Sequence, residues 1–317
     1  MSSPQHAGST QKGWAHLLLD HPYVLLVLAP VFWGGNITAG KLAVGQIAPE
    51  MLVLGRWVGA SLILLPFAWN AIRRDWPKIM PGLPALFFYG ALGFAGFNMA
   101  MYTAAAYTAA VNASIEQAAI PVLVLLGNFL IFSVRPRLLQ IVGLILTIIG
   151  VIWVATHGEP ARLLHLDVNF GDALVLLACL FYAAYSLTLR YRPDISWMSF
   201  IFITALSALV ASLIFTMFSP GGIAATIPKA AEITPLGWAC LAYVMVFPSI
   251  LAQLCYARGL HLVGPNRASI FINLLPLTGT ILSVLIIGER LEPFHMVAAI
   301  LVIAGIVLAE YSVRRNK

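Results

Sequence analysis

The chain has 317 residues, of which 61% are hydrophobic and 9% charged, and its formal net charge is +6. A soluble domain carries roughly 25% charged residues, so this chain cannot cover a water-facing surface and its partner must be a lipid bilayer. The basic residues are scattered through short loops without interleaved aromatics, which excludes a nucleic-acid partner.

Apolar stretches of about 20 residues follow one another without the alternation that marks barrel strands. They predict an all-α, polytopic membrane protein with ten transmembrane helices, separated by Pro and Gly residues as at Pro81-Gly82. The first stretch is too long for the apolar core of a signal peptide. Residues 1–22 and 313–317 lie outside the spans and are predicted to be cytoplasmic tails. The predicted spans are residues 23–45, 49–70, 82–107, 111–133, 138–156, 171–190, 197–218, 235–257, 266–287 and 293–312.

The Lys and Arg residues of the loops predict the orientation. Thirteen of the 18 fall on the side of the N-terminus, three (Arg162, Lys229 and Arg290) fall on the opposite side, and Lys41 and Arg56 lie within spans. Because cytoplasmic loops carry the excess of positive charge, both termini are predicted to be cytoplasmic. The expected location is the plasma membrane, which in a bacterium is the inner membrane.

A segment of the first half is repeated in the second half. Residues 111–153 align without a gap onto residues 266–308, at an offset of 155, with 12 of 43 positions identical. In the predicted orientation the fourth span runs inward and its copy, the ninth, runs outward. We therefore predict two inverted five-helix repeats, residues 23–156 and 171–312, which is the architecture of many secondary transporters.

Several short motifs are specific when taken together, although none is a catalytic signature. They are Arg56, the Gly171-Asp172 opening of the sixth span, the entry Gly264-Pro265-Asn266-Arg267-Ala268, Pro276, Gly288-Glu289 and Gly305. At these residues the chain resembles the EamA-type families of the drug/metabolite transporter superfamily, over essentially its whole length. The Gly-Glu loop is present only in the second half, since the first half has Val134 in place of Glu289.

This resemblance implies export of small metabolites, often amino acids or related compounds, or of drugs, although uptake members exist. Together with the inverted repeat, it predicts a secondary transporter that exports small organic metabolites by alternating access. An uptake permease or a multidrug efflux carrier of the same fold is the alternative. A channel or a membrane-embedded enzyme is disfavoured, because no HExxH, GxSxG or Walker-type motif occurs, and no metal or cofactor is expected. A monomer and a homodimer both fit the sequence.

Ionisable groups within spans are costly, so they are candidates for function. Glu116 and Arg56 both lie about two turns from the outer end of their spans. We expect them either to pair and close an outer gate or, for Glu116, to take a proton as the substrate leaves, which makes the proton a candidate coupling ion. Lys41 is expected to snorkel to the membrane surface.

Uncharged polar and aromatic side chains complete the predicted cavity, although some such groups only join neighbouring helices. Trp33 and Tyr182 are equivalent at an offset of 149, and they could stack on an organic cation or an aromatic ring. Pro121 and Pro276 are equivalent mid-span prolines and are predicted hinges. The predicted substrate-binding residues are Trp33, Asn36, Asn98, Tyr102, Glu116, Gln117, Tyr182, Tyr185, Gln253, Tyr256 and Asn273.

Overall fold

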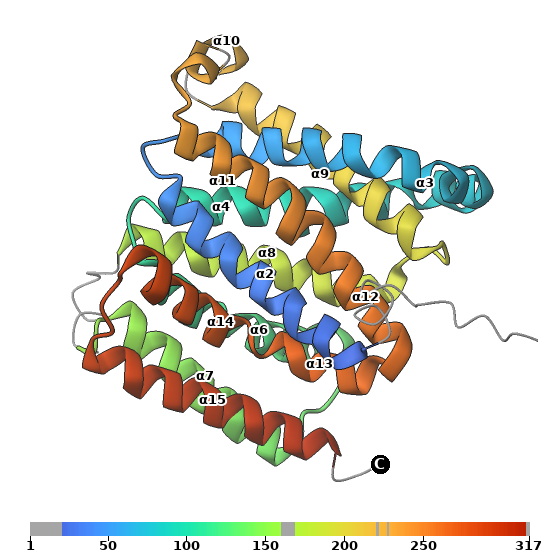
Figure 1. Ribbon diagram of the computed structural model, residues 1–317. Coiled ribbons are helices and arrows are strands. Elements are labelled where there is room, and N and C mark those ends of the chain that lie inside the picture. Colours follow the sequence, from blue (N-terminus) through green and yellow to red (C-terminus); the bar gives the residue numbers. More distant parts are fainter. Residues whose placement is uncertain (1–20, 160–168, 220–221, 227, 315–317) are drawn as a thin grey trace, which may run out of the picture.

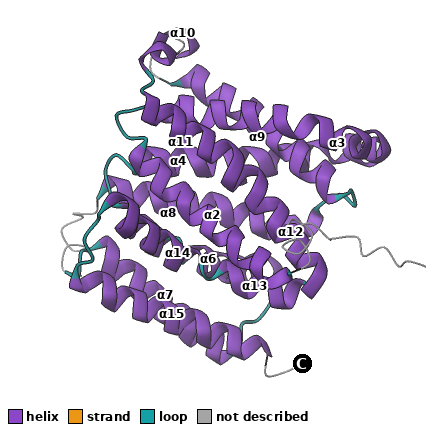
Figure 2. Ribbon diagram, in the orientation of Figure 1, coloured by secondary structure: helices purple, strands orange, loops and turns teal. Residues whose placement is uncertain are grey.

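The computed structural model describes residues 21–159, 169–219, 222–226 and 228–314. Within these ranges all regular structure is helical and no strand occurs (Figures 1 and 2). Seven helices are long and apolar enough to cross a membrane, and two shorter apolar helices run over Leu275–Ile287 and Pro293–Ala309. The predicted all-α, multi-pass class is therefore confirmed. The predicted tails lie almost wholly outside the described residues.

The helices follow one another with short connections, and proline opens several of them because its missing N–H would be unpaired in a first turn anyway. In chain order they are α2 (Pro22–Leu42), α3 (Pro49–Phe88), η1 (Tyr89–Gly96), α4 (Phe97–Ala104), α5 (Ala110–Glu116), α6 (Ala119–Phe132), α7 (Leu138–Ala155), α8 (Phe170–Thr188), η3 (Leu189–Tyr191), α9 (Trp197–Phe218), α10 (Gly222–Thr226), η4 (Pro228–Glu232), α11 (Pro235–Val246), η5 (Phe247–Leu251), α12 (Ala252–Val263), α13 (Pro265–Ile272), α14 (Leu275–Leu282), η6 (Ser283–Ile287) and α15 (Pro293–Arg314).

The predicted second and third spans form one helical run, Pro49–Ala104, of 56 residues. At 1.5 Å per residue a straight run would measure about 84 Å, far more than the ~30 Å hydrocarbon core, so it has to fold back. Figure 1 shows α3 crossing the molecule, turning at its far end and returning as α4. The break predicted at Pro81-Gly82 is wrong, because α3 continues to Phe88 and the four prolines inside it bend the helix rather than end it.

Asp75 lies in that turn, between the two predicted crossings, and joins it to α9. Its Oδ2 accepts hydrogen bonds from the Ser196 N–H and the Ser199 hydroxyl, each at 2.8 Å. Hydrogen bonds from Ser196, and then from Ser199, hold the pKa of Asp75 well below its usual range. Ser196 is the N-cap of α9, so the carboxylate also faces the positive end of that helix.

The predicted fourth and ninth spans are each broken near the middle. The chain leaves α5 after Glu116 and enters α6, and it leaves α13 after Ile272 and enters α14. The breaks, at residues 117–118 and 273–274, end two or three residues before the equivalent prolines Pro121 and Pro276, since proline removes the helical N–H that would bond to the carbonyl four residues earlier.

Other irregularities recur at the same offset. The π-helical segment η5 begins at Phe247, which is equivalent to Leu92 inside the π-helical segment η1. Ser133 and Gly288 are also equivalent, and both have left-handed backbone conformations, with φ of 56° and 77°. A π-helical segment is rare, and a left-handed conformation at the end of a helix is disfavoured for serine. Two copies of one five-helix unit would produce this set of coincidences.

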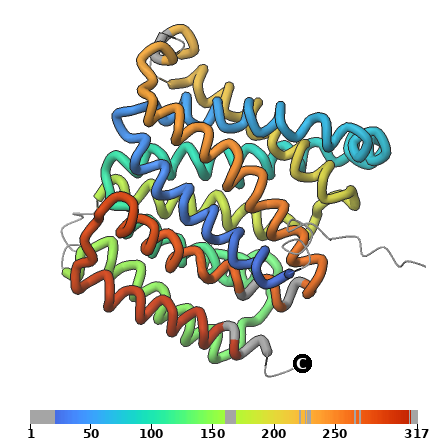
Figure 3. Tube along the Cα trace, viewed as in Figure 1, coloured from blue at the N-terminus to red at the C-terminus, as the bar shows by residue number. Residues whose placement is uncertain are grey.

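The last helices of the two halves, α7 and α15, pack along each other, although they are far apart in the sequence (Figure 3). A Cβ atom on Gly143 would collide with the carbonyl oxygen of Gly305, and one on Gly305 would collide with Thr147. Small residues let helix backbones approach closely in a membrane, where lipid offers no hydrophobic drive for association.

Candidate functional site

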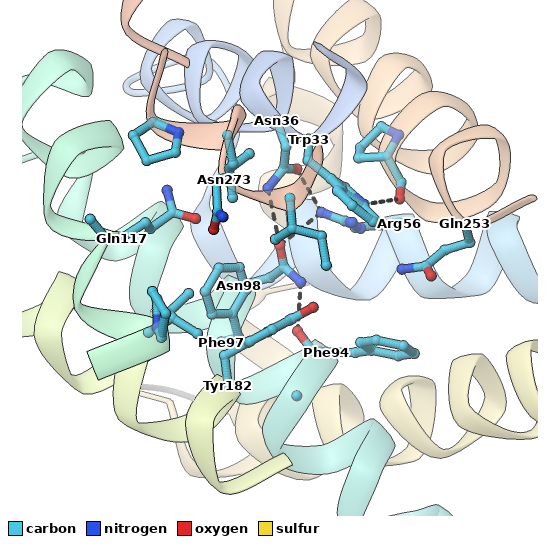
Figure 4. A pocket seen from close by; sticks show the side chains of 18 of the residues that line it. Trp33, Asn36, Arg56, Phe94, Phe97, Asn98, Gln117, Tyr182, Gln253 and Asn273 are labelled. Carbon is cyan, nitrogen blue, oxygen red and sulfur yellow. Dashed lines mark hydrogen bonds between the residues drawn. The ribbon is translucent and has the colours of Figure 1, made fainter. Parts of the chain in front are cut away.

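A cavity of about 100 Å³ lies where α2, α3, η1, α8, η5 and the two broken helices meet (Figure 4). Its walls are mainly aromatic, amide and proline side chains. No three His, Cys, Asp or Glu side chains among the described residues are grouped so that they could hold a metal ion. Of the residues predicted for the site, the cavity is lined by Trp33, Asn36, Arg56, Asn98, Gln117, Pro121, Tyr182, Gln253, Asn273 and Pro276.

Equivalent positions of the two halves meet in this cavity. Asn98 and Gln253 line it from two helices that match at the offset of 155, and Pro121 and Pro276 line it from the two broken helices. The breaks matter here, because an interrupted helix exposes backbone and side-chain polar groups at a depth where an intact helix would bury them. The cavity therefore combines the two broken helices and the π-helical segments η1 and η5 with regular stretches of α2, α3, α4, α8 and α12.

Arg56 is the centre of a buried hydrogen-bond network in the cavity wall (Figure 4). The residue is 4% exposed. Its Nε donates to the Ser249 hydroxyl at 2.6 Å. Its Nη1 lies 2.6 Å from Asn36 Oδ1, 2.8 Å from Asn98 Oδ1 and 2.6 Å from the Tyr102 hydroxyl. The guanidinium thus joins α2, α3, α4 and η5, which fixes its position.

The predicted pair between Arg56 and Glu116 is wrong. Glu116 does not line the cavity; it is fully buried, and neither of its carboxyl oxygens has a hydrogen-bond partner among the described residues. Its neighbours are on α8: Cys179 Sγ donates to the Glu116 carbonyl oxygen at 3.7 Å, and Asp172 is close enough to act on it electrostatically. The pair fails because Arg56 is satisfied by neutral groups on other helices, while Glu116 faces α8.

Three tyrosines predicted for the site stand behind the cavity wall. Tyr102 belongs to the hydrogen-bond network just described. The ring of Tyr185 packs against Phe94, with centroids 5.7 Å apart, and the ring of Tyr256 packs against Trp33, with centroids 5.6 Å apart. Each supports a lining residue instead of facing the cavity itself.

Other residues of the site lie outside the predicted set. Trp57 follows Arg56 directly, and the guanidinium carbon lies 4.9 Å from the centre of its ring, which is a cation–π distance. Ser249 follows Pro248, a mid-span proline equivalent to Gly93 in η1. This equivalence is the feature of the sequence that could have indicated Ser249 as a residue of the site. The missed residues are Trp57, Phe94 and Phe97, which line the cavity, and Ser249, which binds Arg56.

A second hollow of about 190 Å³ adjoins the cavity and shares Pro121, Asn273 and Ile306 with it. It extends along α7 from Gln140 to Thr147 and along the second half of α15. These segments adjoin the beginning of α7 and the end of α15, so the second hollow leads from the cavity toward that end of the helices.

Glu289 lies toward the opposite end of these helices, in the loop before α15. Its Oε1 accepts a hydrogen bond from the Ala110 N–H at 2.9 Å, and its Oε2 accepts one from the Val111 N–H at 2.8 Å. These are the first two N–H groups of α5, which have no partner inside the helix, and a carboxylate there also faces the positive end of the helix. The Gly-Glu loop of the second half therefore caps a broken helix of the first half. Val134 at the equivalent place cannot do the same.

Lys41 joins α2 to the segment after α4. Its ammonium group donates to the carbonyl oxygens of Ala105 at 2.8 Å and Thr108 at 2.7 Å, just after α4. These carbonyls follow the end of α4, have no helical partner and bind the charge. That Lys41 snorkels to the membrane surface stays a prediction.

The comparison with known proteins agrees with this architecture. The model of the EamA-like transporter family matches residues 21–156 and 169–311. This chain belongs to the EamA-like transporter family. It is therefore a multi-pass membrane protein of a transporter family within the drug/metabolite transporter superfamily.

Its relatives have similar lengths and are described only as transporters. The uncharacterized transporter YyaM of Bacillus subtilis is 25% identical, covering 93% of this chain and 95% of its own. The uncharacterized inner membrane transporter YicL of Salmonella typhimurium is 22% identical over 98% of both chains. One solved crystal structure covers 93% of this chain and 98% of its own, with a TM-score of 0.60 and 14% identity, and so has a similar fold.

Proposed function

We propose that this protein is a secondary transporter that exports small organic metabolites, amino acids or related compounds, across the plasma membrane by alternating access. The observation that carries the proposal is the cavity in which equivalent positions of the two halves meet, because secondary transporters bind substrate between inverted repeats. The proposal includes repeats at residues 23–156 and 171–312 and cytoplasmic termini. It also includes ten crossings, of which the run Pro49–Ala104 supplies two.

In this proposal the two ends of the cavity are not equivalent. Glu289 and Lys41 hold the outer end closed through bonds between separate helices. The second hollow reaches toward the beginning of α7 and the end of α15, which is the cytoplasmic side in the proposed orientation. Substrate would enter from the cytoplasm, and release to the outside would require the Glu289 and Lys41 contacts to break.

We further propose that Glu116 carries the coupling proton. An ionised carboxylate without a partner in a buried site costs several kcal/mol, so the protonated carboxyl suits the closed conformation. The neighbour of Glu116 is a second acidic group, Asp172, and not a cation that would stabilise its ionised form. Asp172 is also fully buried and has no well-formed hydrogen bond. Opening of the outer end would admit water to α5 and α8, so that Glu116 can take its proton from the outside as the substrate leaves.

The test of transport is counterflow in proteoliposomes. Proteoliposomes that contain the purified protein are loaded with unlabelled amino acids, nucleosides or quaternary amines in turn. Uptake of the labelled compound is followed with and without a pH gradient. Counterflow of at least one compound supports a carrier. Absence of counterflow throughout, or single-channel currents from the same protein, would refute it.

The test of coupling is Glu116→Gln, which removes the titratable proton at constant shape. We expect this variant to keep counterflow, because exchange needs no net proton movement, and to lose accumulation driven by a pH gradient. Glu292→Gln is the matched control, since Glu292 is an exposed carboxylate in the loop before α15. Accumulation by Glu116→Gln equal to that of the parent would sink the proton proposal and leave transport itself intact.

A further inference from the structure

The charge of Arg56 has no counter-charge among the residues that the structure describes. The ion pairs Arg74–Asp75 and Lys78–Asp194 lie at the turn of α3 and do not involve it. Every hydrogen bond of Arg56 goes to a hydroxyl or an amide oxygen. A guanidinium stays protonated at any physiological pH, so one uncompensated positive charge faces the cavity within the membrane, where burial of a charge is costly.

One arm of this guanidinium is left for a ligand. The known bonds engage Nε and Nη1, whereas Nη2, with its two N–H groups, bonds to none of the residues that the structure describes. Although Nη2 has no such partner, it is not fully enclosed by protein atoms. It therefore keeps accessible surface, and Arg56 lines the cavity. The bonds to the other nitrogens hold this arm in place before any ligand arrives.

The remaining lining adds neutral polar groups and apolar walls. Arg56 is the only charged residue among the described ones that line the cavity. In the view of Figure 4, Asn273 lies on one side of its guanidinium and Gln253 on the other. Neither amide, nor the Tyr182 hydroxyl, is bonded through its side chain to a described residue, so all three can bind a ligand. Trp33 and Trp57 provide flat apolar surface beside them.

We propose that the transported solute is a small organic monocarboxylate, free or as an amino acid, whose carboxylate binds Nη2 of Arg56. A single guanidinium balances one negative charge, so a doubly charged phosphate ester would remain half unpaired. An organic cation, which the aromatic walls alone would suit, would meet the like charge of Arg56. The apolar body of the solute lies against the indole rings, and a second polar group meets Gln253 or Asn273. This inference rests on the proposed transport function and specifies its substrate class.

The test uses matched ligands on the intact, purified protein. Monocarboxylates from acetate to indole-3-acetate, together with 3-phenylpropanoate and phenylalanine, are titrated by calorimetry. Each acid is compared with its carboxamide and with the amine that lacks the carboxyl group. Hydrogen bonds to charged groups contribute about 1.5–3 kcal/mol, so an acid should bind roughly 10- to 100-fold more tightly than its amide. This comparison needs no mutation, so misfolding cannot obscure it.

Two variants locate the carboxylate site. Arg56→Gln should abolish the preference for the acid over the amide, and Arg56→Lys should keep the preference with weaker binding. Arg73→Gln is the matched control, because Arg73 is an exposed arginine stacked on Trp69, outside the cavity. Equal affinity for acid and amide, preference for the amine, or no binding across the panel each overturns the proposal. Counterflow of a neutral or cationic solute would then leave the transport function standing, whereas absence of all counterflow would remove that function too.

Discussion

The bond between Glu289 and the beginning of α5 makes a quantitative prediction about access to the cavity. Glu289→Gln removes the negative charge and places an N–H group against the helix N–H that Oε2 now accepts from. A lost helix cap costs about 1 kcal/mol, and a lost carboxylate at a helix beginning costs about 0.5–1 kcal/mol more. The sum, about 2 kcal/mol, corresponds to a shift of roughly 30-fold in a two-state equilibrium.

If α5 and the loop before α15 separate when the outer end opens, that shift favours the outward-open state. The assay labels a cysteine at Asn273, in a variant whose Cys179, Cys240 and Cys255 are replaced by serine. An impermeant maleimide is added from outside to cells or right-side-out vesicles. We expect labelling of Glu289→Gln to be roughly 10- to 30-fold faster than labelling of the parent.

The control is Glu292→Gln, which loses the same charge three residues away. Its side chain is exposed, and the first N–H groups of α5 bond to Glu289 instead, so labelling should match the parent. The reasoning is refuted if Glu289→Gln is labelled at the parent rate while it retains its fold, or if both variants are accelerated equally. The second result would mean that surface charge, not the cap, controls access of the reagent.

Two further predictions concern stability in detergent. Asp75→Asn should lower the melting temperature at pH 7, and the difference from the parent should shrink as the pH falls below about 4. A depressed pKa in the folded state stabilises above the unfolded pKa, and this stabilisation is lost as the carboxylate is protonated. Gly143→Val should separate α7 from α15 and lower the melting temperature by several degrees. The same change at Gly45 is the comparison, because a side chain added there meets open space and only the left-handed backbone is strained. Gly45→Val should therefore lower the free energy of unfolding by only about 1 kcal/mol. Equal losses at the two glycines would contradict the packing argument.

Much of the site's composition was accessible from the sequence. A polar side chain in a lipid-facing position is penalised, so amides such as Asn98, Gln253 and Asn273 had to face protein, and their place in the spans indicated a common depth. The prolines of the broken helices were visible as equivalent residues. Whether these residues bind substrate remains a prediction.

Partners of the charged groups could not be predicted in the same way. Arg56 and Glu116 lie at similar depth, and depth alone made them plausible partners. The direction in which each side chain points depends on how α3 and α5 are rotated and on which helices pack beside them. Glu289 accepts a hydrogen bond from Val111, which lies 178 residues away in the other half of the chain. No local sequence pattern could therefore reveal that Glu289 caps α5.

The sequence by itself determined the solvent, the helical class and the family, because these depend on composition, on hydropathy over about 20 residues and on short motifs. It also indicated the repeat, since equivalent residues survive in both copies. Only the tertiary structure decided that the long run after Pro49 turns back without a break. It alone decided that Arg56 is held by neutral groups with one arm free and that Glu116 faces α8. The reason is that hydrogen bonds in a buried, low-dielectric interior are set by whichever helices meet there, and that meeting is a property of the whole fold.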